Sequence, residues 1–217
     1  MSPAPKAPKA LDGAPLGAPR VLTNTTSPYA RIARIALHEK GFDLGDTRLL
    51  NPWTDDEEML AANPASRVPT VVLRSGLPLT ESLLIVMWLE RAAPEPALLP
   101  LEDLDRTVSL AGRAMGVIDA MANIVTGFMQ IDPDFAESKV GLKRRRTIIE
   151  GLKALDADAP AYGGGTPDIA VITTVTAVDY LDLRFADAPW RPEIPALRAL
   201  RDQVAARPAF SQTEPYV

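Results

Sequence analysis

Short apolar runs and helical patterns alternate between residues 20 and 92, and this order restricts the fold more than any other feature of the sequence. The runs typical of strands are 20–24, 46–50 and the two halves of 68–80, which flank the turn signal Ser75-Gly76. Helical periodicity covers 28–41, 54–63 and 81–92. The predicted order is βαβαββα, which indicates an α/β domain of the thioredoxin-like type.

The remainder of the chain has a different pattern. A Pro-punctuated connector at 94–102 is followed by four helical segments, which are 104–129, 135–155, 166–185 and 194–207. The third is rich in β-branched residues, but about 20 residues without a turn signal are too long for an ordinary strand. We therefore expect a flexible Ala/Pro-rich tail at 1–19, an α/β domain at 20–93, a linker at 94–102 and an all-α domain at 103–217.

Charge and composition exclude several classes of protein. The net charge is −5, which argues against a nucleic-acid partner, and the cluster "KRRR" at 143–146 is followed by a helical pattern that predicts a solvated face. The tail lacks the apolar core of a signal peptide. No apolar run is expected to span a bilayer, so we expect a cytoplasmic protein without a membrane partner.

The content of cysteine and histidine restricts the chemistry further. The chain has no Cys and one His, His38, at the end of a predicted helix. Disulfides, thiolate nucleophiles on the protein and Cys- or His-rich metal sites are thereby excluded, and no metal is expected. His38 near exposed helical carbonyls is an ordinary structural choice.

The stretch "TNTTSPYARIARIALHEKG" places small polar residues directly before a helix. Ser and Thr are preferred there as caps, and Pro28 at the first helical position has no amide to leave unpaired. The same hydroxyls could instead form an active site. The stretch alone does not decide between these interpretations.

Five motifs in order resemble the glutathione S-transferase superfamily over nearly all of residues 20–217. They are "SPYARIARIALHEKG", "NPASRVPTVVL", "LPLTESLLIVMWLE", "PDIAVITTVTAVDYLDLRF" and "ALRALRDQVAARPAF". The resemblance implies a thioredoxin-like domain followed by a helical domain and a homodimer. It also implies a cytoplasmic transferase active in detoxification, with glutathione as co-substrate and a small hydrophobic electrophile as the second substrate.

The resemblance also implies the glutathione site. Val68-Pro69 suits a cis peptide, and in the family this turn exposes the backbone that pairs with the cysteinyl part of glutathione. Arg67 could hold a carboxylate. Glu81 and Ser82 would bind the γ-glutamyl end, Glu81 its ammonium and Ser82 its carboxylate. The alternative is that "TESLL" is only a second helix cap.

A hydroxyl can activate glutathione without a Cys, a His or a metal. Converting most of the thiol to thiolate at pH 7 requires lowering a pKa near 8.5 by about two units, or about 2.7 kcal/mol. A hydrogen bond to the anion contributes about 1.5–3 kcal/mol, and a helix N-terminus adds about 0.3–2 kcal/mol. By position in different family classes, Ser27, Thr26 and Thr25 are all candidates, and we favour them in that order.

The electrophile pocket is expected between the domains, along the first long helix of the second one. Met115, Ile118 and Ala122 form one stripe there by their three- and four-residue spacing, although such a stripe is more often core. The family's usual hydroxyl before the buried helix is replaced by Gly165, so Thr166 could shift its start by one residue. A glutathione-dependent disulfide reductase or isomerase, and a non-catalytic interaction module on the same fold, are the alternative functions.

Overall fold

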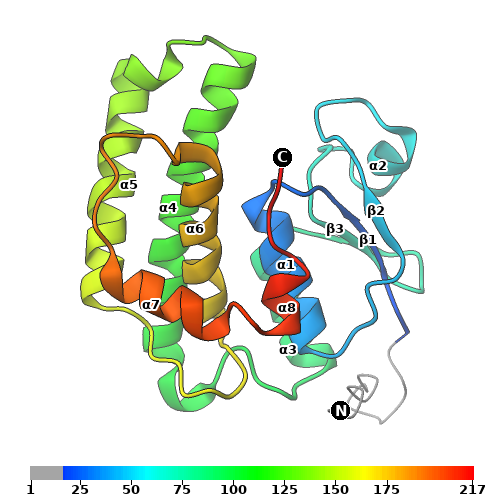
Figure 1. Cartoon of the computed structure of the whole chain (residues 1–217). Coiled ribbons are helices and arrows are strands. Elements are labelled where there is room, and N and C mark those ends of the chain that lie inside the picture. The colour runs from blue at the N-terminus through cyan, green and yellow to red at the C-terminus, as the bar shows by residue number, and fades with distance from the viewer. Residues whose placement is uncertain (1–16) are drawn as a thin grey trace. The chain divides into compact units, whose positions relative to one another are not determined.

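The computed structural model describes residues 17–217, so residues 1–16 of the predicted tail lie outside the described part. The chain forms two compact units (Figure 1). The first contains the part of the chain up to Leu98 together with Arg207–Val217, and the second contains Leu99–Ala206.

The first unit has the predicted order of elements. They are β1 (Arg20–Thr23), α1 (Pro28–Glu39), β2 (Thr47–Leu49), α2 (Glu57–Ala62), β3 (Thr70–Val72), β4 (Pro78–Thr80) and α3 (Ser82–Ala92). The prediction of a βαβαββα domain is confirmed. Val68-Pro69 is a cis peptide, as its sequence suggested, and so is Glu95-Pro96.

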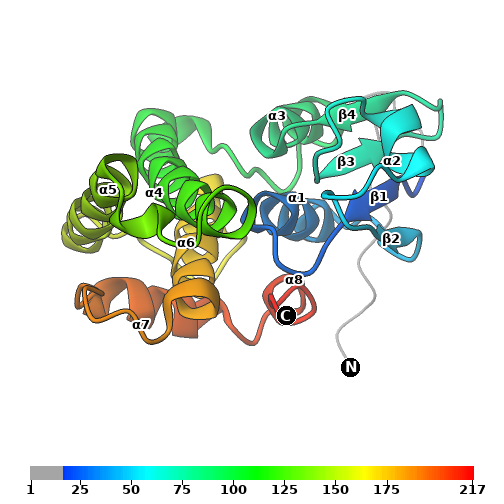
Figure 2. The ribbon, with the colours of Figure 1, turned by 90° about the horizontal axis from the view of Figure 1, so that it is seen from above.

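The four strands form one mixed sheet in the order β2-β1-β3-β4. β1 is parallel to β2 and antiparallel to β3, and β3 is antiparallel to β4. Helices α1 and α3 lie against one face of this sheet, and α2 lies on the other (Figures 1 and 2). The two central strands, β1 and β3, are mostly buried, whereas the edge strands β2 and β4 are half-buried or exposed.

Helix α1 shows why its sequence forms a helix at this place. Ser27 is its N-cap and Pro28 its first residue, while Ile32, Ile35 and Ala36 are fully buried on one stripe. Gly41 follows with a positive φ of 77°, a conformation that Gly adopts without steric cost. The helix therefore has a strong start and a sharp end, and both are encoded locally.

The second unit is helical, as predicted. It contains α4 (Leu104–Gln130), α5 (Lys139–Ala157), α6 (Ile169–Phe185) and α7 (Pro195–Val204), with short 3-10 turns η1 (Leu101–Asp103) and η2 (Phe135–Glu137). α4 packs against α5 and α6, and α6 is buried along most of its length. Its N-cap is Asp168, whose carboxylate accepts from the Val171 amide, so the helix begins later than Gly165 or Thr166 would suggest.

The last eleven residues group with the first unit, which differs from the expected extent of the helical domain, 103–217. Helix α8 (Pro208–Ser211) packs against α1. Just before it, the Arg207 guanidinium donates from Nε and Nη2 to the two Glu39 carboxylate oxygens, at 3.0 and 2.7 Å. The Glu39 side chain is only 8% exposed, so this two-point pair fixes the returning segment to α1.

One helical stretch differs from the expectation that no run could span a bilayer. Leu101–Gln130 is long and apolar enough by length and composition, and its most apolar 18-residue window has a mean hydropathy of 1.3. Half of its most apolar window is buried inside the protein, and the core helix of a soluble protein meets the same two criteria. By itself, this stretch is therefore weak evidence for a membrane span.

Candidate functional site

The register of the sheet brings three chain segments together at one end. Leu22 of β1 pairs with Thr70 of β3, and Thr70 pairs with Thr80 of β4. The residues that follow β1, precede β3 and follow β4 therefore leave the sheet at the same end. Because neighbouring strands lie about 4.8 Å apart, the three strand ends from which these segments leave lie within about 10 Å of one another. They contain Ser27, Val68 and Glu81.

The loop after β1 holds Ser27 by two hydrogen bonds. The Ser27 amide donates to Asn24 Oδ1 at 2.8 Å, and the Ala30 amide donates to Ser27 Oγ at 3.2 Å. The capping interpretation of this stretch is thus realised. Capping uses Oγ as an acceptor only, so the hydroxyl hydrogen remains available to a further acceptor. The cap and an anion-binding role are compatible in one side chain.

Thr25 and Thr26 lie in the bend between Asn24 and Ser27, and both are half-buried. Within the described residues, neither hydroxyl makes a hydrogen bond. Their availability keeps all three hydroxyls as candidates. Only Ser27 is held at the helix N-terminus by a hydrogen bond of its side chain.

The turn before β3 is held by Asn63, a residue that the sequence analysis did not select. Asn63 Nδ2 donates to the Arg67 carbonyl and to Thr70 Oγ1, both at 3.1 Å, and Thr70 Oγ1 donates to the same carbonyl at 2.9 Å. Asn63 is 7% exposed. A lone Asn after a helix is a common C-cap residue, so no local signal distinguished it.

Val68 presents unpaired backbone groups. Its amide and carbonyl make no hydrogen bond to any described residue, although β3 begins only two residues later. Pro69, the next residue, has no amide at all. An extended peptide could therefore add its own backbone hydrogen bonds at this position, as in strand addition to a sheet edge.

The start of α3 carries an unusual backbone conformation. Glu81 has a φ of 64°, which is uncommon for any residue other than Gly and costs about 1–3 kcal/mol. Its side chain makes no capping hydrogen bond. The Glu81 carboxylate instead lies 3.8 Å from the Arg67 guanidinium, with both side chains mostly exposed. The interpretation of Glu81 as a simple cap is therefore not supported by the geometry.

Ser82, the first residue of α3, is 3% exposed. Its hydroxyl makes no hydrogen bond to the described part of the chain. The amides of the first turn of a helix have no intrahelical acceptor, and the helix dipole favours an anion there. The start of α3 can therefore bind a carboxylate.

The three residues predicted to line an electrophile pocket belong to α4, in the second unit. Ile118 is fully buried, whereas Met115 and Ala122 are half-buried. They share one stripe of α4, as their spacing predicted. Their role as pocket residues stays a prediction.

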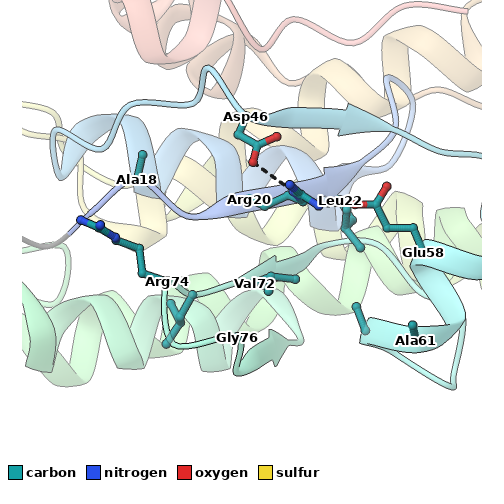
Figure 3. A pocket seen from close by; sticks show the side chains of 11 residues that line it. Ala18, Arg20, Leu22, Asp46, Glu58, Ala61, Val72, Arg74 and Gly76 are labelled. Carbon is teal, nitrogen blue, oxygen red and sulfur yellow. Dashed lines mark hydrogen bonds and ion pairs between the residues drawn. The ribbon is translucent and has the colours of Figure 1, made fainter.

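Two cavities in the first unit involve other residues. One, of about 430 Å³, lies over β1, β3 and α2, where Arg20 pairs with Asp46 and Glu58 (Figure 3). The other, of about 390 Å³, lies beside the second half of α1. Neither includes a predicted site residue. Among residues 17–217, no cluster of three or more His, Cys, Asp or Glu side chains is arranged to hold a metal ion.

The mixed sheet and the helices of the first unit define a thioredoxin-like domain, which is followed by a helical unit. A family model described as glutathione S-transferase, N-terminal domain, matches residues 26–92. This match covers the three segments that meet at the end of the sheet.

Relatives over the full length agree with that match. The chain is 29% identical over 203 residues to an uncharacterized GST-like protein, YibF, of Escherichia coli, covering 90% of this chain and 98% of the relative. It is 30% identical over 204 residues to a maleylacetoacetate isomerase of Pseudomonas aeruginosa, covering 88% and 92%. A glutathione S-transferase of Methylobacterium radiotolerans, solved in complex with glutathione sulfonate, is similar in structure with a TM-score of 0.82 at 29% identity, covering 92% and 96%. The chain therefore belongs to the glutathione S-transferase superfamily.

Proposed function

We propose that this protein is a glutathione transferase that joins the sulfur of glutathione to a small apolar electrophile. The observation that carries the proposal is the Ser27 hydroxyl, which is fixed at the N-terminus of α1 while its hydrogen stays uncommitted. The solved structure of a relative with glutathione sulfonate supports glutathione as the ligand.

The arrangement of open polar groups fits an extended tripeptide. Val68 would pair its free backbone groups with the cysteinyl residue, and Pro69 fixes the turn beside it. At the start of α3, Glu81 would take the γ-glutamyl ammonium and Ser82 its carboxylate, while Arg67 could hold a carboxylate nearby. Three extended residues span about 10 Å, which equals two strand spacings from β1 to β4.

The chemistry then requires little from the protein. Ser27 donates a hydrogen bond to the thiolate, which lowers the thiol pKa and raises the thiolate fraction at neutral pH. The thiolate sulfur forms a bond to the electrophilic carbon, and the electron pair leaves with a departing group or takes up a proton. Thr26 and Thr25 are the alternatives to Ser27, and the second substrate is proposed to lie against Met115, Ile118 and Ala122.

An isomerase is the second candidate, because a relative of 30% identity is a maleylacetoacetate isomerase. Such a reaction uses the same thiolate, which adds to a double bond and then leaves, so glutathione is recovered. A disulfide reductase remains an alternative, although this sequence has no Cys to form a mixed disulfide with glutathione. A non-catalytic interaction module would need neither Ser27 nor a bound thiolate.

Calorimetric titration with glutathione tests the common part of these proposals. We expect one site per chain, weakened in Glu81→Gln and unchanged in the surface control Arg91→Met. Absence of heat in the wild type would favour the interaction module. Product analysis then separates the enzymes, because a transferase consumes one glutathione per product, an isomerase consumes none and a reductase releases oxidised glutathione.

We also propose that the protein is a cytoplasmic homodimer, as is usual for relatives of this fold. Light scattering at micromolar concentration measures the mass directly. A mass equal to one chain would contradict this proposal without affecting the assignment of the glutathione site.

A further inference from the structure

The cavity of about 390 Å³ beside α1 is lined by a cationic side chain, Arg34, that has no carboxylate partner in the described part of the chain. Its lining comes from three places, which are the second half of α1, the loop before β2 and the segment after α8. Arg34 and His38 of α1 both line it, four residues apart and therefore on the same face of the helix. The size is within the usual range for small-molecule sites.

The Arg34 guanidinium is incompletely paired. Nη2 donates to the Gln212 carbonyl at 3.2 Å, whereas Nε is buried without an acceptor. Within residues 17–217, no carboxylate forms an ion pair with Arg34. Burial and the nearby charge of Arg31 lower the pKa of Arg34, against a smaller opposing effect of Tyr216. Arg34 as a whole is half-buried, but a buried Nε–H without an acceptor is unfavourable unless a ligand supplies one.

Two carboxylates near the cavity, Asp43 and Glu39, could affect an anion bound at Arg34. Asp43 lines the cavity as well, and its Oδ1 accepts from the Gly45 amide at 2.9 Å. It is exposed to solvent, so its repulsion of an anion at Arg34 is screened. Glu39, the neighbouring acid on α1, is already paired with Arg207. Neither of these two acids neutralises Arg34, so the site is open to an anion from outside the chain.

We propose that this cavity is a second ligand site, separate from the glutathione site, which binds a small anion carrying a carboxylate or a phosphate. The anion accepts from Arg34 Nε and from a free guanidinium N–H, in the two-point geometry typical of arginine with such groups. The His38 imidazole adds a further N–H donor from the next turn of α1.

The single histidine of the chain makes this proposal directly measurable. In the untagged full chain, the imidazole C–H signals in the NMR spectrum report on His38 alone. Inorganic phosphate and citrate are titrated separately at constant ionic strength, with chloride as the control and without glutathione. We expect a saturable shift of the His38 signals with at least one of the two anions, and the effective one identifies the ligand group.

Variants separate specific binding from a general salt effect. Arg34→Met should weaken the binding that causes the His38 shift by about tenfold or more, because a hydrogen-bonded charge is lost. Arg34→Lys should retain part of it, and Arg91→Met, on an exposed face, should leave it unchanged. If the variants fail to fold, the wild-type titration still shows whether phosphate or citrate binds saturably near His38.

Three results would overturn the proposal. The first is the absence of a saturable shift, or a shift that chloride reproduces; the second is an equal response in a folded Arg34→Met protein; the third is displacement of the anion by saturating glutathione. Glutathione added at saturation should leave the His38 response intact, and its displacement of the anion would assign that response to the glutathione site. The test thus fails or succeeds independently of the transferase proposal.

Discussion

Replacement of Ser27 by Ala tests two roles of one hydroxyl at once. The structure shows Ser27 Oγ accepting from the Ala30 amide, so loss of the cap should lower the free energy of unfolding by about 0.5–2 kcal/mol. Loss of the donor should raise the pKa of bound glutathione, because a hydrogen bond to a charged group contributes about 1.5–3 kcal/mol. At 1.36 kcal/mol per pKa unit, the rise is about one to two units.

The consequence for activity follows from the thiolate fraction. With a bound pKa near 6.5, about three quarters of the thiol is ionised at pH 7, and a rise of one to two units reduces this to about 24% or about 3%. The rate of conjugation at pH 7 should therefore fall by about 3- to 25-fold and recover at higher pH. The ultraviolet absorbance of the thiolate, followed against pH in the bound complex, measures the pKa directly.

The variant Ser27→Gly separates the two roles, because Gly is nearly as good an N-cap as Ser but has no hydroxyl. It should show the full rise in thiol pKa with a loss of only a few tenths of a kcal/mol in stability. A thiol pKa that stays constant in both variants, while Ser27→Ala loses stability, would refute the anion-binding role of Ser27. A rise confined to Thr26→Ala or Thr25→Ala would transfer the role to that residue.

Three further substitutions follow from the geometry. Glu81→Gly should leave the free energy of unfolding unchanged or raise it by up to about 2 kcal/mol, because relief of the positive φ offsets the conformational entropy that Gly loses on folding. The same variant should weaken glutathione binding by about 1–3 kcal/mol in calorimetry, because the carboxylate is lost. Asn63→Ala should lower stability in urea unfolding by about 2–3 kcal/mol, because it removes buried hydrogen bonds. Although burial raises the pKa of Asp182, the hydrogen bonds and charges of Arg198 and Arg191 outweigh it and lower that pKa below 3.8. The stabilisation by ionised Asp182 is therefore present above pH 3.8 and is lost as the pH falls through its folded pKa, so Asp182→Asn should lower Tm near pH 7 but far less near about pH 3.

The order of elements could be predicted because each one is encoded locally. The first helix has its cap, its proline and its apolar stripe within residues 27–41, and the hairpin has its glycine at the turn. The predicted start of α6 was less accurate. The hydroxyl residue usual before this helix is missing, and the observed N-cap, Asp168, lies inside the motif itself. The short helix α8 was not foreseen, since four residues carry no periodicity.

The candidate site was predictable only in part, because its geometry depends on contacts distant in sequence. The positions of Arg67, Val68 and Glu81 follow from the strand register, which motif spacing anticipates. The role of Asn63 depends on the fold of the turn it spans. Likewise, the incomplete pairing of Arg34 becomes visible only when Gln212, 178 residues away, lies against it.

The return of the C-terminal segment to the first unit has a consequence for biosynthesis. Glu39 finds its partner Arg207 only after the whole stretch Leu99–Ala206 has been made. At about 5–20 residues per second, a ribosome needs roughly 5 to 20 seconds for that stretch. During this interval the nascent α/β domain carries an unneutralised carboxylate and an uncovered face of α1. The α/β domain can therefore complete its packing only after Arg207 and α8 have emerged from the ribosome.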